Sequence, residues 1–543
     1  MIQKRHNWFL THIEYQGHGK AKFEDPKGIL EGHVLIRFNE FGNYTVEMDV
    51  ENCKPDQPLQ FDLLEFFSAE KPIKENGEIE FTPNLGSNKC ISLIVETSDG
   101  VYSTTRNIIY NPIISFSSNN QCKVVFYIVE SQFDVKQERV PKYWVMPLFN
   151  FVSKFQQRNL QLDNHPLRIR PRQDDMQNTT SLAERKELLF PSNLITFTFK
   201  NNLGFIEPLV DFSKRKNILY SGQSQCVITA VMICEVDCQS CQSIDIENLN
   251  TWLPLGFLSL LSLATGTEVT SPWVEFRDVN GEIVKRIHRN FVKPTFSKGH
   301  TTISEVTHQG TGYLLTCAQS SPYYCKQPLG SVLFDLVQSS SGNFTIEDKL
   351  NKICRAFDSL CKYHNLDTQN LLLGLDSINQ ELVKNTLQSA AKNIRNIAKT
   401  TIDSQQSKLL KKIADKTINA SNKDRDFGLA VTDLLKKLGL HDEAIIDSHY
   451  QSNPRTDGTQ HWSGVISNYR GIVVHKGDFG FQVGTYDVHD VVRITHHLHD
   501  ILVRIVFQML GYNGTYQPTM IRVPVKKPVD WVKSNLSAKE LGY

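Results

Sequence analysis

Residues 462–477 read WSGVISNYRGIVVHKG, and their apolar side chains recur three and four positions apart. Trp462, Val465, Ile466, Tyr469 and Val473 therefore share one face of an α-helix. The pattern predicts an amphipathic helix that turns this face toward a hydrophobic core.

Helical segments flank this one on both sides. The same three-four spacing of apolar residues occurs in residues 346–361 and 427–440. Long polar helical stretches occupy residues 377–399 and 405–418. A longer apolar stripe runs through residues 488–509 and stops at Leu510-Gly511. Together they predict an all-helical bundle of about five or six helices over residues 343–520. Residues 521–543 are left as a C-terminal tail.

The preceding sequence is of a different kind. Residues 1–200 are predicted to form a β-rich domain: 32–51 reads as two strands around a Phe-Gly-Asn turn, and the short β-branched runs at 90–97, 122–130 and 194–200 have strand length. Residues 201–342 are predicted to form a mixed α/β domain. It contains a buried helix at 253–263 and a hairpin at 273–285 that turns at Asn280-Gly281.

The breaker-rich segment QSSSG at 338–342 is the expected boundary before the helical bundle. The fold class is therefore multidomain α+β, with a β-rich N-terminal region followed by an all-α helical bundle.

Length and composition narrow the class of protein. The chain has 543 residues, which is too many for a single hydrophobic core. Its net charge of +1 does not by itself indicate a nucleic-acid or membrane partner. Its eleven cysteines favour reduced thiols in a cytosolic protein over a disulfide framework. Residues 1–10 lack the apolar stretch of a signal peptide, and the longest apolar run, 252–264, is too short to span a bilayer. We expect a cytoplasmic protein without a membrane anchor.

The candidate catalytic residues are Arg470 and His475, which lie in the segment SNYRGIVVHKG with four residues between them. Arginine and histidine at this kind of spacing occur three more times, at Arg158/His165, Arg455/His461 and Arg493/His499. Only the pair Arg470/His475 lies between the two strongest apolar stripes of the helical region.

With this motif, residues 345–518 resemble the HEPN superfamily, and within it the ApeA-like HEPN proteins. The long helix ending in Leu-Gly-Tyr at 510–512 supports the resemblance, and WLPLGFLSLLSLATG at 252–266 supports it more weakly. The resemblance implies an HEPN helical bundle, an RNA-cleaving site at Arg470 and His475, and a composite site shared by two chains. It also implies a role in anti-phage defence by abortive infection, with the N-terminal region sensing a phage-derived trigger. The family usually has a small polar residue directly after the arginine, where this chain has Gly471.

These residue types suit RNA cleavage by the 2′-OH of the substrate. A histidine can act as base or acid near neutral pH, and an arginine grips phosphate with its planar fork. A metal is not required, so we expect a metal-independent endoribonuclease with no cofactor. One chain supplies one motif histidine for two proton transfers, which favours a homodimer or higher homo-oligomer.

A basic segment indicates how RNA would be held. Residues 381–426 contain ten Lys and Arg against five Asp and Glu, and the candidate RNA-binding residues within it are Lys408, Lys411, Lys412 and Lys416. The alternative is that these charges belong to a solvent-exposed helix surface that does not bind RNA. No aromatic residues interleave with them, so base stacking is not indicated.

Two other readings of the chain stay open. The first is a catalytically silent HEPN scaffold that binds RNA or protein. The second is a lectin-like or other binding module built on the β-rich region, in which the helical domain serves only for assembly. Cys234, Cys238 and Cys241 resemble half of a zinc site, but no second pair is evident, and ordinary thiols explain them. No nucleotide-binding or nucleophile-elbow motif occurs.

Overall fold

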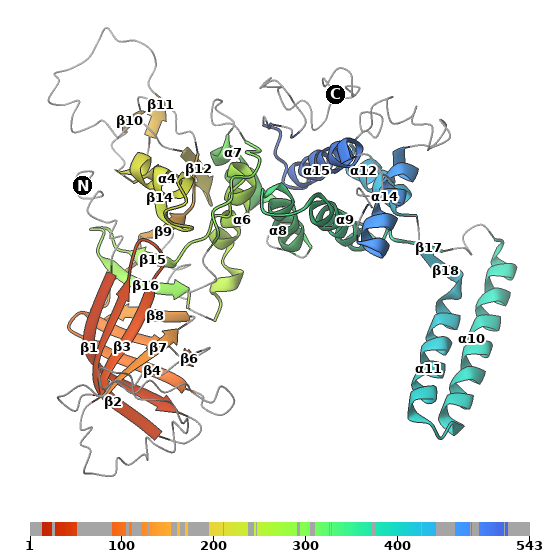
Figure 1. The fold of residues 1–543 in the computed structure, drawn as a ribbon, viewed down its shortest axis with the longest axis horizontal. Coiled ribbons are helices and arrows are strands. Elements are labelled where there is room, and N and C mark those ends of the chain that lie inside the picture. The colour runs from red at the N-terminus through yellow and green to blue at the C-terminus, as the bar shows by residue number, and fades with distance from the viewer. Residues whose placement is uncertain are drawn as a thin grey trace, which may run out of the picture.

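The structure, a computed structural model, describes residues 13–23, 28–50, 90–104, 108–110, 122–128, 130–153, 160–162, 169–171, 195–209, 211–236, 244–245, 247–289, 294–303, 310–324, 326, 328–370, 375–424, 426–440, 462–477, 479, 488–514, 516–517 and 519. Within these residues the fold is mixed α+β, as the sequence predicts. Strands dominate the N-terminal part and helices the C-terminal part (Figure 1).

Among the described residues, fourteen strands form one antiparallel sheet in the order β1-β2-β3-β7-β6-β4-β5-β8-β16-β15-β9-β14-β13-β12. An additional pairing of β1 with β4 closes the first six of these strands into a ring. The strands are β1 (Ile13–Phe23), β2 (Gly28–Phe38), β3 (Tyr44–Val50), β4 (Cys90–Thr97), β5 (Gly100–Thr104), β6 (Ile108–Tyr110), β7 (Cys122–Ile128), β8 (Glu130–Val135), β9 (Tyr143–Phe149), β12 (Ile195–Phe199), β13 (Asn202–Pro208), β14 (Ile228–Glu235), β15 (Trp273–Arg277) and β16 (Ile283–Arg289). Two short pairs lie outside the sheet: β10 (Leu160–Leu162) with β11 (Ile169–Pro171), and β17 (Thr368–Asn370) with β18 (Asn422–Asp424).

Both predicted hairpins are present. β2 pairs with β3 around a turn in which Gly42 has a φ of 73°, and β15 pairs with β16 around a turn in which Gly281 has a φ of 83°. Glycine tolerates these left-handed angles because it has no Cβ. The predicted boundary at 200/201, by contrast, falls in the turn of the β12–β13 hairpin, and the sheet continues through β16. The β-rich region therefore extends well past residue 200.

The helices are α4 (Phe212–Tyr220), α6 (Leu253–Thr265), α7 (Thr311–Ser320), α8 (Leu329–Ser340), α9 (Ile346–Tyr363), α10 (Ser377–Thr400), α11 (Ser404–Ile418), α12 (Phe427–Lys437), α14 (Trp462–Lys476) and α15 (Val488–Met509), with single 3₁₀ turns at Leu249–Thr251 and Asn419–Ser421. In the bundle, α9 packs against α8, α12, α14 and α15. Asp376, Asp403 and Asp426 cap the N-termini of α10, α11 and α12 by accepting backbone N–H hydrogen bonds. None of the helices among the described residues combines the length and the hydropathy needed to cross a bilayer.

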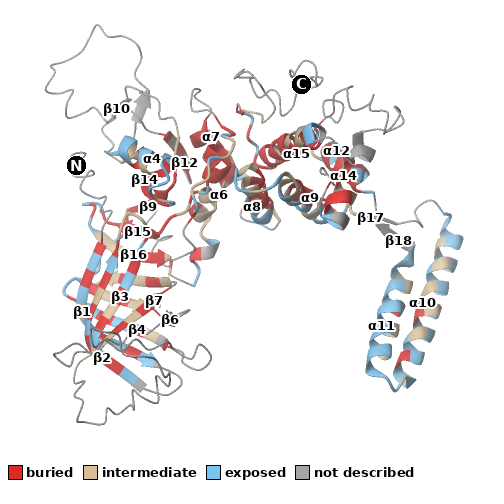
Figure 2. Ribbon diagram, viewed as in Figure 1, coloured by how far each residue is buried: buried red, intermediate tan, exposed pale blue. Residues whose placement is uncertain are grey.

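One hydrophobic core runs from the sheet into the helical bundle. It includes Trp144 and Met232 of the sheet, Phe257 of α6, and Phe357 and Leu502 of the bundle. Helix α8 lies before the predicted boundary at 342/343, yet it packs directly on α9 and α15. That boundary therefore does not separate two cores, because α6 and α8 fill the space between the sheet and the bundle (Figure 2).

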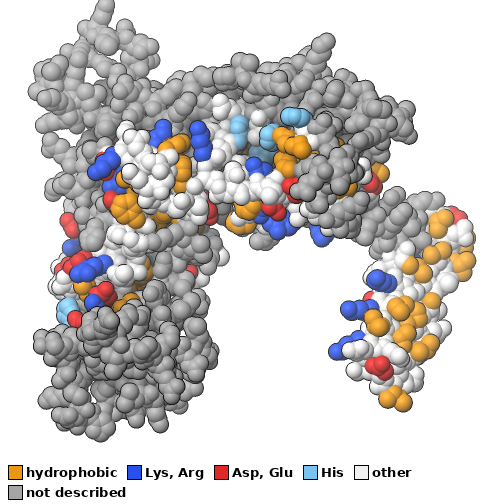
Figure 3. All heavy atoms as spheres, in the orientation of Figure 1, with side chains coloured by type: hydrophobic (Ala, Val, Ile, Leu, Met, Phe, Trp, Pro, Cys, Tyr) orange, Lys and Arg blue, Asp and Glu red, His pale blue; other side chains and the backbone are white. Residues whose placement is uncertain are grey.

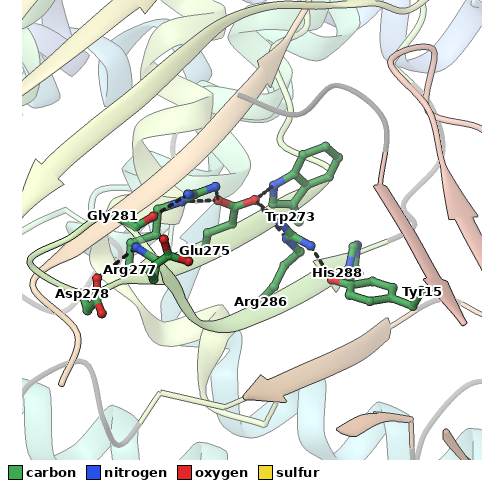
Figure 4. Close-up of polar contacts among 9 residues, drawn as sticks. Tyr15, Trp273, Glu275, Arg277, Asp278, Gly281, Arg286 and His288 are labelled. Carbon is green, nitrogen blue, oxygen red and sulfur yellow. Dashed lines mark hydrogen bonds and ion pairs between the residues drawn. The ribbon is translucent and has the colours of Figure 1, made fainter. Parts of the chain in front are cut away.

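A second core lies inside the first strands, and a buried ion network closes one side of it (Figure 4). The Glu275 carboxylate accepts hydrogen bonds from Arg277 Nε at 2.6 Å, Arg286 Nε at 2.9 Å and Trp273 Nε1 at 2.8 Å. Arg286 also donates to the Tyr15 hydroxyl, which links the β15–β16 hairpin to β1. Burial opposes ionisation of Glu275, but the two guanidinium groups outweigh it and lower the pKa of the carboxyl.

Helices α10 and α11 form a hairpin that projects from the bundle (Figure 1). Only Ala391, Ala398 and Ala414 of these two helices are fully buried. Hydrophobic side chains gather along one face of the hairpin and Lys and Arg along one edge (Figure 3). The hairpin thus has almost no core of its own.

Candidate active site

Helix α14 carries both predicted catalytic residues. Ile466, Tyr469 and Val473 of the predicted stripe are buried in the bundle core, and Ile472 is buried beside them. The side chains of Trp462 and Val465 lie outside the described residues. The helix ends at Gly477, which has a φ of 77° and donates its N–H to the Val473 carbonyl. The stripe therefore fixes which side of α14 faces the core.

Arg470 is held at the surface of the bundle by two earlier helices. Its Nη2 donates to Asp358 Oδ2 of α9 at 2.9 Å, and its guanidinium lies 5.0 Å from the centre of the Phe427 ring of α12. The side chain of Arg470 is 29% exposed, although its Nε is buried and makes no hydrogen bond with the described residues. Because guanidinium has five N–H donors and the bond to Asp358 uses one, donors remain for a phosphate.

His475 lies five residues after Arg470 on the same helix, and its side chain lies outside the described residues. The sequence argument requires α14 to end or bend near Gly471 if both side chains are to meet at one phosphate. The structure contradicts that condition, because α14 continues without a break to Lys476. Residues five apart on such a helix point about 140° apart. Positions 470 and 475 of one chain therefore do not share a face of α14.

The space around position 471 does not require a glycine. A Cβ built at this position meets no atom within 4 Å, and its φ is helical. The residue that the HEPN family usually places after the arginine would fit here.

The structure brings together a polar cluster that the sequence does not predict. Asp500 of α15 accepts from the Thr519 hydroxyl at 2.6 Å and lies 3.8 Å from His499 Nδ1, while His300 Nε2 lies 2.7 Å from the Gln517 carbonyl oxygen. Burial opposes the charge of Asp500, but His499 and Thr519 outweigh it and lower its pKa. Burial lowers the pKa of His300 and of His496, and Asp500 partly offsets both shifts. His300 and Asp500 are distant in sequence, so periodicity alone could not associate them.

The charged groups that shift the pKa of His496 are Asp500, His499, Lys349 and His300, and neither Arg470 nor its partner Asp358 is among them. The described residues contain no group of three or more His, Cys, Asp or Glu side chains arranged to hold a metal ion.

The other candidate residues are dispersed. Lys408, Lys411, Lys412 and Lys416 are exposed and share one face of α11. Cys234 is buried in β14, whereas Cys238 and Cys241 lie outside the described residues. Of the alternative motif pairs, Arg158, His165, Arg455 and His461 also lie outside them, as does the side chain of Arg493.

Comparison with known proteins adds no relative. No protein-family model, no curated protein and no solved structure matches the chain. The resemblance to the HEPN superfamily therefore stays a prediction made from the motif and its helical context.

Proposed function

We propose that the protein is a metal-independent endoribonuclease that cleaves RNA by 2′-OH transesterification, with Arg470 and His475 as its catalytic residues. The observation that carries the proposal is the position of the motif. Arg470 lies on a helix of the bundle and is held by Asp358 and Phe427, with its side chain 29% exposed. A phosphate placed there would be gripped by the remaining N–H donors, and charge developing on phosphate would be stabilised.

The site is formed by two chains. Because α14 is continuous through Gly471, positions 470 and 475 of one chain lie on different faces of the helix. A two-fold dimer can place Arg470 of one protomer beside His475 of its partner, and it supplies two histidines for the two proton transfers.

Two copies of the chain pair through the surface of the hairpin formed by α10 and α11. Its exposed hydrophobic residues are Ile378, Leu382, Ile397, Ile402, Leu409 and Ile413. Two helices packed about 10 Å apart, the longer about 36 Å long, present roughly 700 Å² on each copy, close to the approximately 800 Å² per partner of a stable interface. Helix α15 offers no such face, since its described side chains from Val491 to Met509 are buried or half-buried.

Pairing through this face leaves the lysines free. On α11 the lysine face is centred about 100° from the exposed apolar residues Leu409 and Ile413, so the lysines of two copies need not meet. Lys408, Lys411, Lys412 and Lys416 of both copies then form one basic surface for RNA. We further propose that this activity serves anti-phage defence by abortive infection, a role that the resemblance to ApeA-like proteins supports.

The test is cleavage of total RNA by purified protein in the presence of EDTA. We expect cleavage to continue and to leave 2′,3′-cyclic phosphate and 5′-OH ends. If chelation stops all cleavage and Mg²⁺ or Mn²⁺ restores it, the mechanism is wrong. A second candidate function is a silent HEPN scaffold that binds RNA without cutting it. Gly471, in place of the usual polar residue, favours that reading, and binding of RNA without any cleavage under all conditions would establish it.

A further inference from the structure

An exposed aromatic pair lies at the C-terminal end of α4. Tyr220 is the last residue of this helix and is 46% exposed. The ring of Phe296 packs against it, with the ring centres 5.2 Å apart and the ring planes at 64°. The Phe296 N–H donates to the Gln225 carbonyl oxygen at 2.9 Å, which holds this segment beside the residues that follow α4. The tyrosine ring is therefore supported by its neighbours and still half open to solvent.

Two lysines lie against the same tyrosine ring. The Lys216 ammonium, one helical turn earlier on α4, is 5.5 Å from the centre of the Tyr220 ring. The Lys298 ammonium, from the segment that carries Phe296, is 5.6 Å from the same centre. Two parts of the chain that are about 80 residues apart thus bring an aromatic surface and two positive charges to one place.

Acidic side chains do not compensate these two lysines. Helix α4 contains no Asp or Glu, and the carboxylates of Asp211 and Glu40 pair with Arg215 of this helix instead. In the part of the chain that the structure describes, no carboxylate forms an ion pair with Lys216 or Lys298. Their charges are therefore available to the phosphates of a ligand.

An aromatic ring flanked by cations has the composition of a site for single-stranded nucleic acid, in which a base stacks on the ring and lysines follow the backbone. An exposed cation–π contact is weaker than the stacking of a base on an aromatic ring. A base can therefore displace an ammonium group from the ring, and that group then pairs with a phosphate. A duplex offers no such base, because its bases are stacked on one another inside the helix.

We propose that Tyr220, Phe296, Lys216 and Lys298 form a binding site for single-stranded RNA. One unpaired base stacks on Tyr220, and the phosphates on either side of it pair with the two lysines. None of these residues belongs to α14 or to α11, so the site adds to the RNA contacts of the proposed nuclease. The choice of RNA as the ligand rests on that proposed function, and the site names the unpaired segment of the substrate that the protein holds.

The test is a fluorescence anisotropy titration of the full chain with three labelled probes: a 2′-O-methyl tetra-adenylate, the same tetramer without bases, and tetraglutamate. The 2′-O-methyl groups block the proposed cleavage, so binding is measured whether or not the protein is a nuclease. We expect the tetramer without bases to bind about 5- to 100-fold more weakly than tetra-adenylate, because it keeps the phosphates and loses the stacking. Tetraglutamate should bind no more tightly than the tetramer without bases. The lysines of α11 bind both tetramers alike, because no aromatic residues interleave with them.

Three variants make the test specific. Tyr220→Leu should weaken binding of tetra-adenylate about 5- to 100-fold and leave binding of the tetramer without bases unchanged. Lys216→Gln combined with Lys298→Gln should lower the slope of log affinity against log salt concentration by about 1.4 for both tetramers, or about 0.7 for each phosphate contact. Tyr363→Leu is the matched control, because Tyr363 is 43% exposed on α9 and does not belong to the site, and it should bind as the wild type does.

Each contrary result overturns the proposal. Equal affinity for the two tetramers refutes base stacking, and tetraglutamate that binds as tightly as tetra-adenylate makes the patch a surface for acidic peptides instead. If Tyr220→Leu folds, as judged by its unfolding temperature, and still prefers the tetramer with bases, the stacking residue lies elsewhere. If that variant does not fold, the double lysine variant decides, since an unchanged salt slope refutes the site.

The two proposals fail separately. Base-dependent binding by a protein that never cleaves unmodified RNA rejects the nuclease and retains this site. Cleavage of RNA without base-dependent binding at Tyr220 rejects the site and retains the nuclease.

Discussion

At the scale of single residues, the position of Arg470 is decided by side chains that do not belong to its motif. Asp358 and Phe427 come from two other helices and hold the guanidinium from two directions. A bond to one carboxylate oxygen restrains the arginine and still leaves donors for phosphate. Asp358 is therefore a positioning residue for the proposed reaction.

We predict that Arg470→Ala and His475→Ala each lower the rate of RNA cleavage by a factor of about 10²–10⁴, because each removes one catalytic group. Cleavage of a labelled RNA at saturating protein measures the effect, and circular dichroism checks the fold. His461→Ala and Arg493→Ala are the matched controls and should cleave normally. A control that is as inactive as the motif variants would show that a different Arg/His pair performs the reaction.

We predict that Gly471→Ala raises the free energy of unfolding by up to about 1 kcal/mol. Glycine is a poor residue for a helix interior, and a Cβ at this position has open space around it. Urea unfolding with an unchanged m-value measures the gain. Gly471→Asn, which introduces a residue that HEPN proteins often have directly after the arginine, should retain or raise cleavage. A large destabilisation by alanine would mean that α14 is not a continuous helix at this point.

At the scale of elements, two hairpins have opposite roles. The β15–β16 hairpin is buried and tied to β1 through Glu275, Arg286 and Tyr15 (Figure 4). The α10–α11 hairpin is exposed along most of its length (Figure 2). The buried β15–β16 hairpin stabilises the fold, whereas the exposed α10–α11 hairpin is accessible to another molecule.

We predict that Glu275→Ala lowers the free energy of unfolding by about 3–5 kcal/mol, because it leaves Arg277 and Arg286 buried without their shared carboxylate. The folded-state pKa of Glu275 is lowered, so its contribution is complete above the ordinary pKa of a glutamate and is lost as the pH falls through the folded value. Unfolding should therefore become easier at acidic pH in the wild type and depend less on pH in the variant. Equal stability of the two proteins at pH 7 would contradict this.

We predict that the α10–α11 hairpins of two copies pair in parallel, since only that arrangement brings the two bundles and their motifs together. Ile402, fully exposed at the tip, then lies near Ile402 of the partner subunit. Ile402→Cys should cross-link to itself with a bismaleimide, above the background of the wild-type cysteines. A mixture of Ile402→Cys and Ile378→Cys should not gain a mixed product. Strong tip-to-base cross-linking would mean antiparallel pairing and would separate the two motifs.

At the scale of the whole molecule, one core joins the sheet to the bundle, while the hairpin stands outside both cores. The sheet and the bundle therefore form one body, because the contacts of α6 and α8 span the region between them. In the proposed function, two chains assemble through the exposed surface of the α10–α11 hairpin, which lies outside this body.

We predict that excess His475→Ala chain inhibits wild-type enzyme when the two are co-expressed. With a ninefold excess of the variant, only about a tenth of wild-type chains pair with another wild-type chain, so cleavage per wild-type chain should fall accordingly. The control is Ile402→Glu with His475→Ala in the same chain, which cannot pair and should not inhibit. Full activity from a species that sediments as a 62.0 kDa monomer would refute the composite site.

Local periodicity determined much of this fold. The three-four spacing of Ile466, Tyr469 and Val473 predicted α14 and its buried face, and the turn residues Gly42 and Gly281 predicted two hairpins. These features are readable because helix and strand periods, and the left-handed angles of glycine, depend on neighbours within a few residues. The candidate pair Arg470/His475 shares its spacing with three other pairs, and only its place between two apolar stripes distinguishes it.

Tertiary structure alone decided the rest. The sheet continues across residue 200 and the core across residue 342, because pairing and packing depend on partners far away in sequence. Asp358 and Arg470 form an ion pair although they are 112 residues apart in sequence. Arg289 likewise lines a cavity together with residues that are distant from it in sequence. Such contacts are set by how whole elements pack, and a single sequence carries no local signal for them.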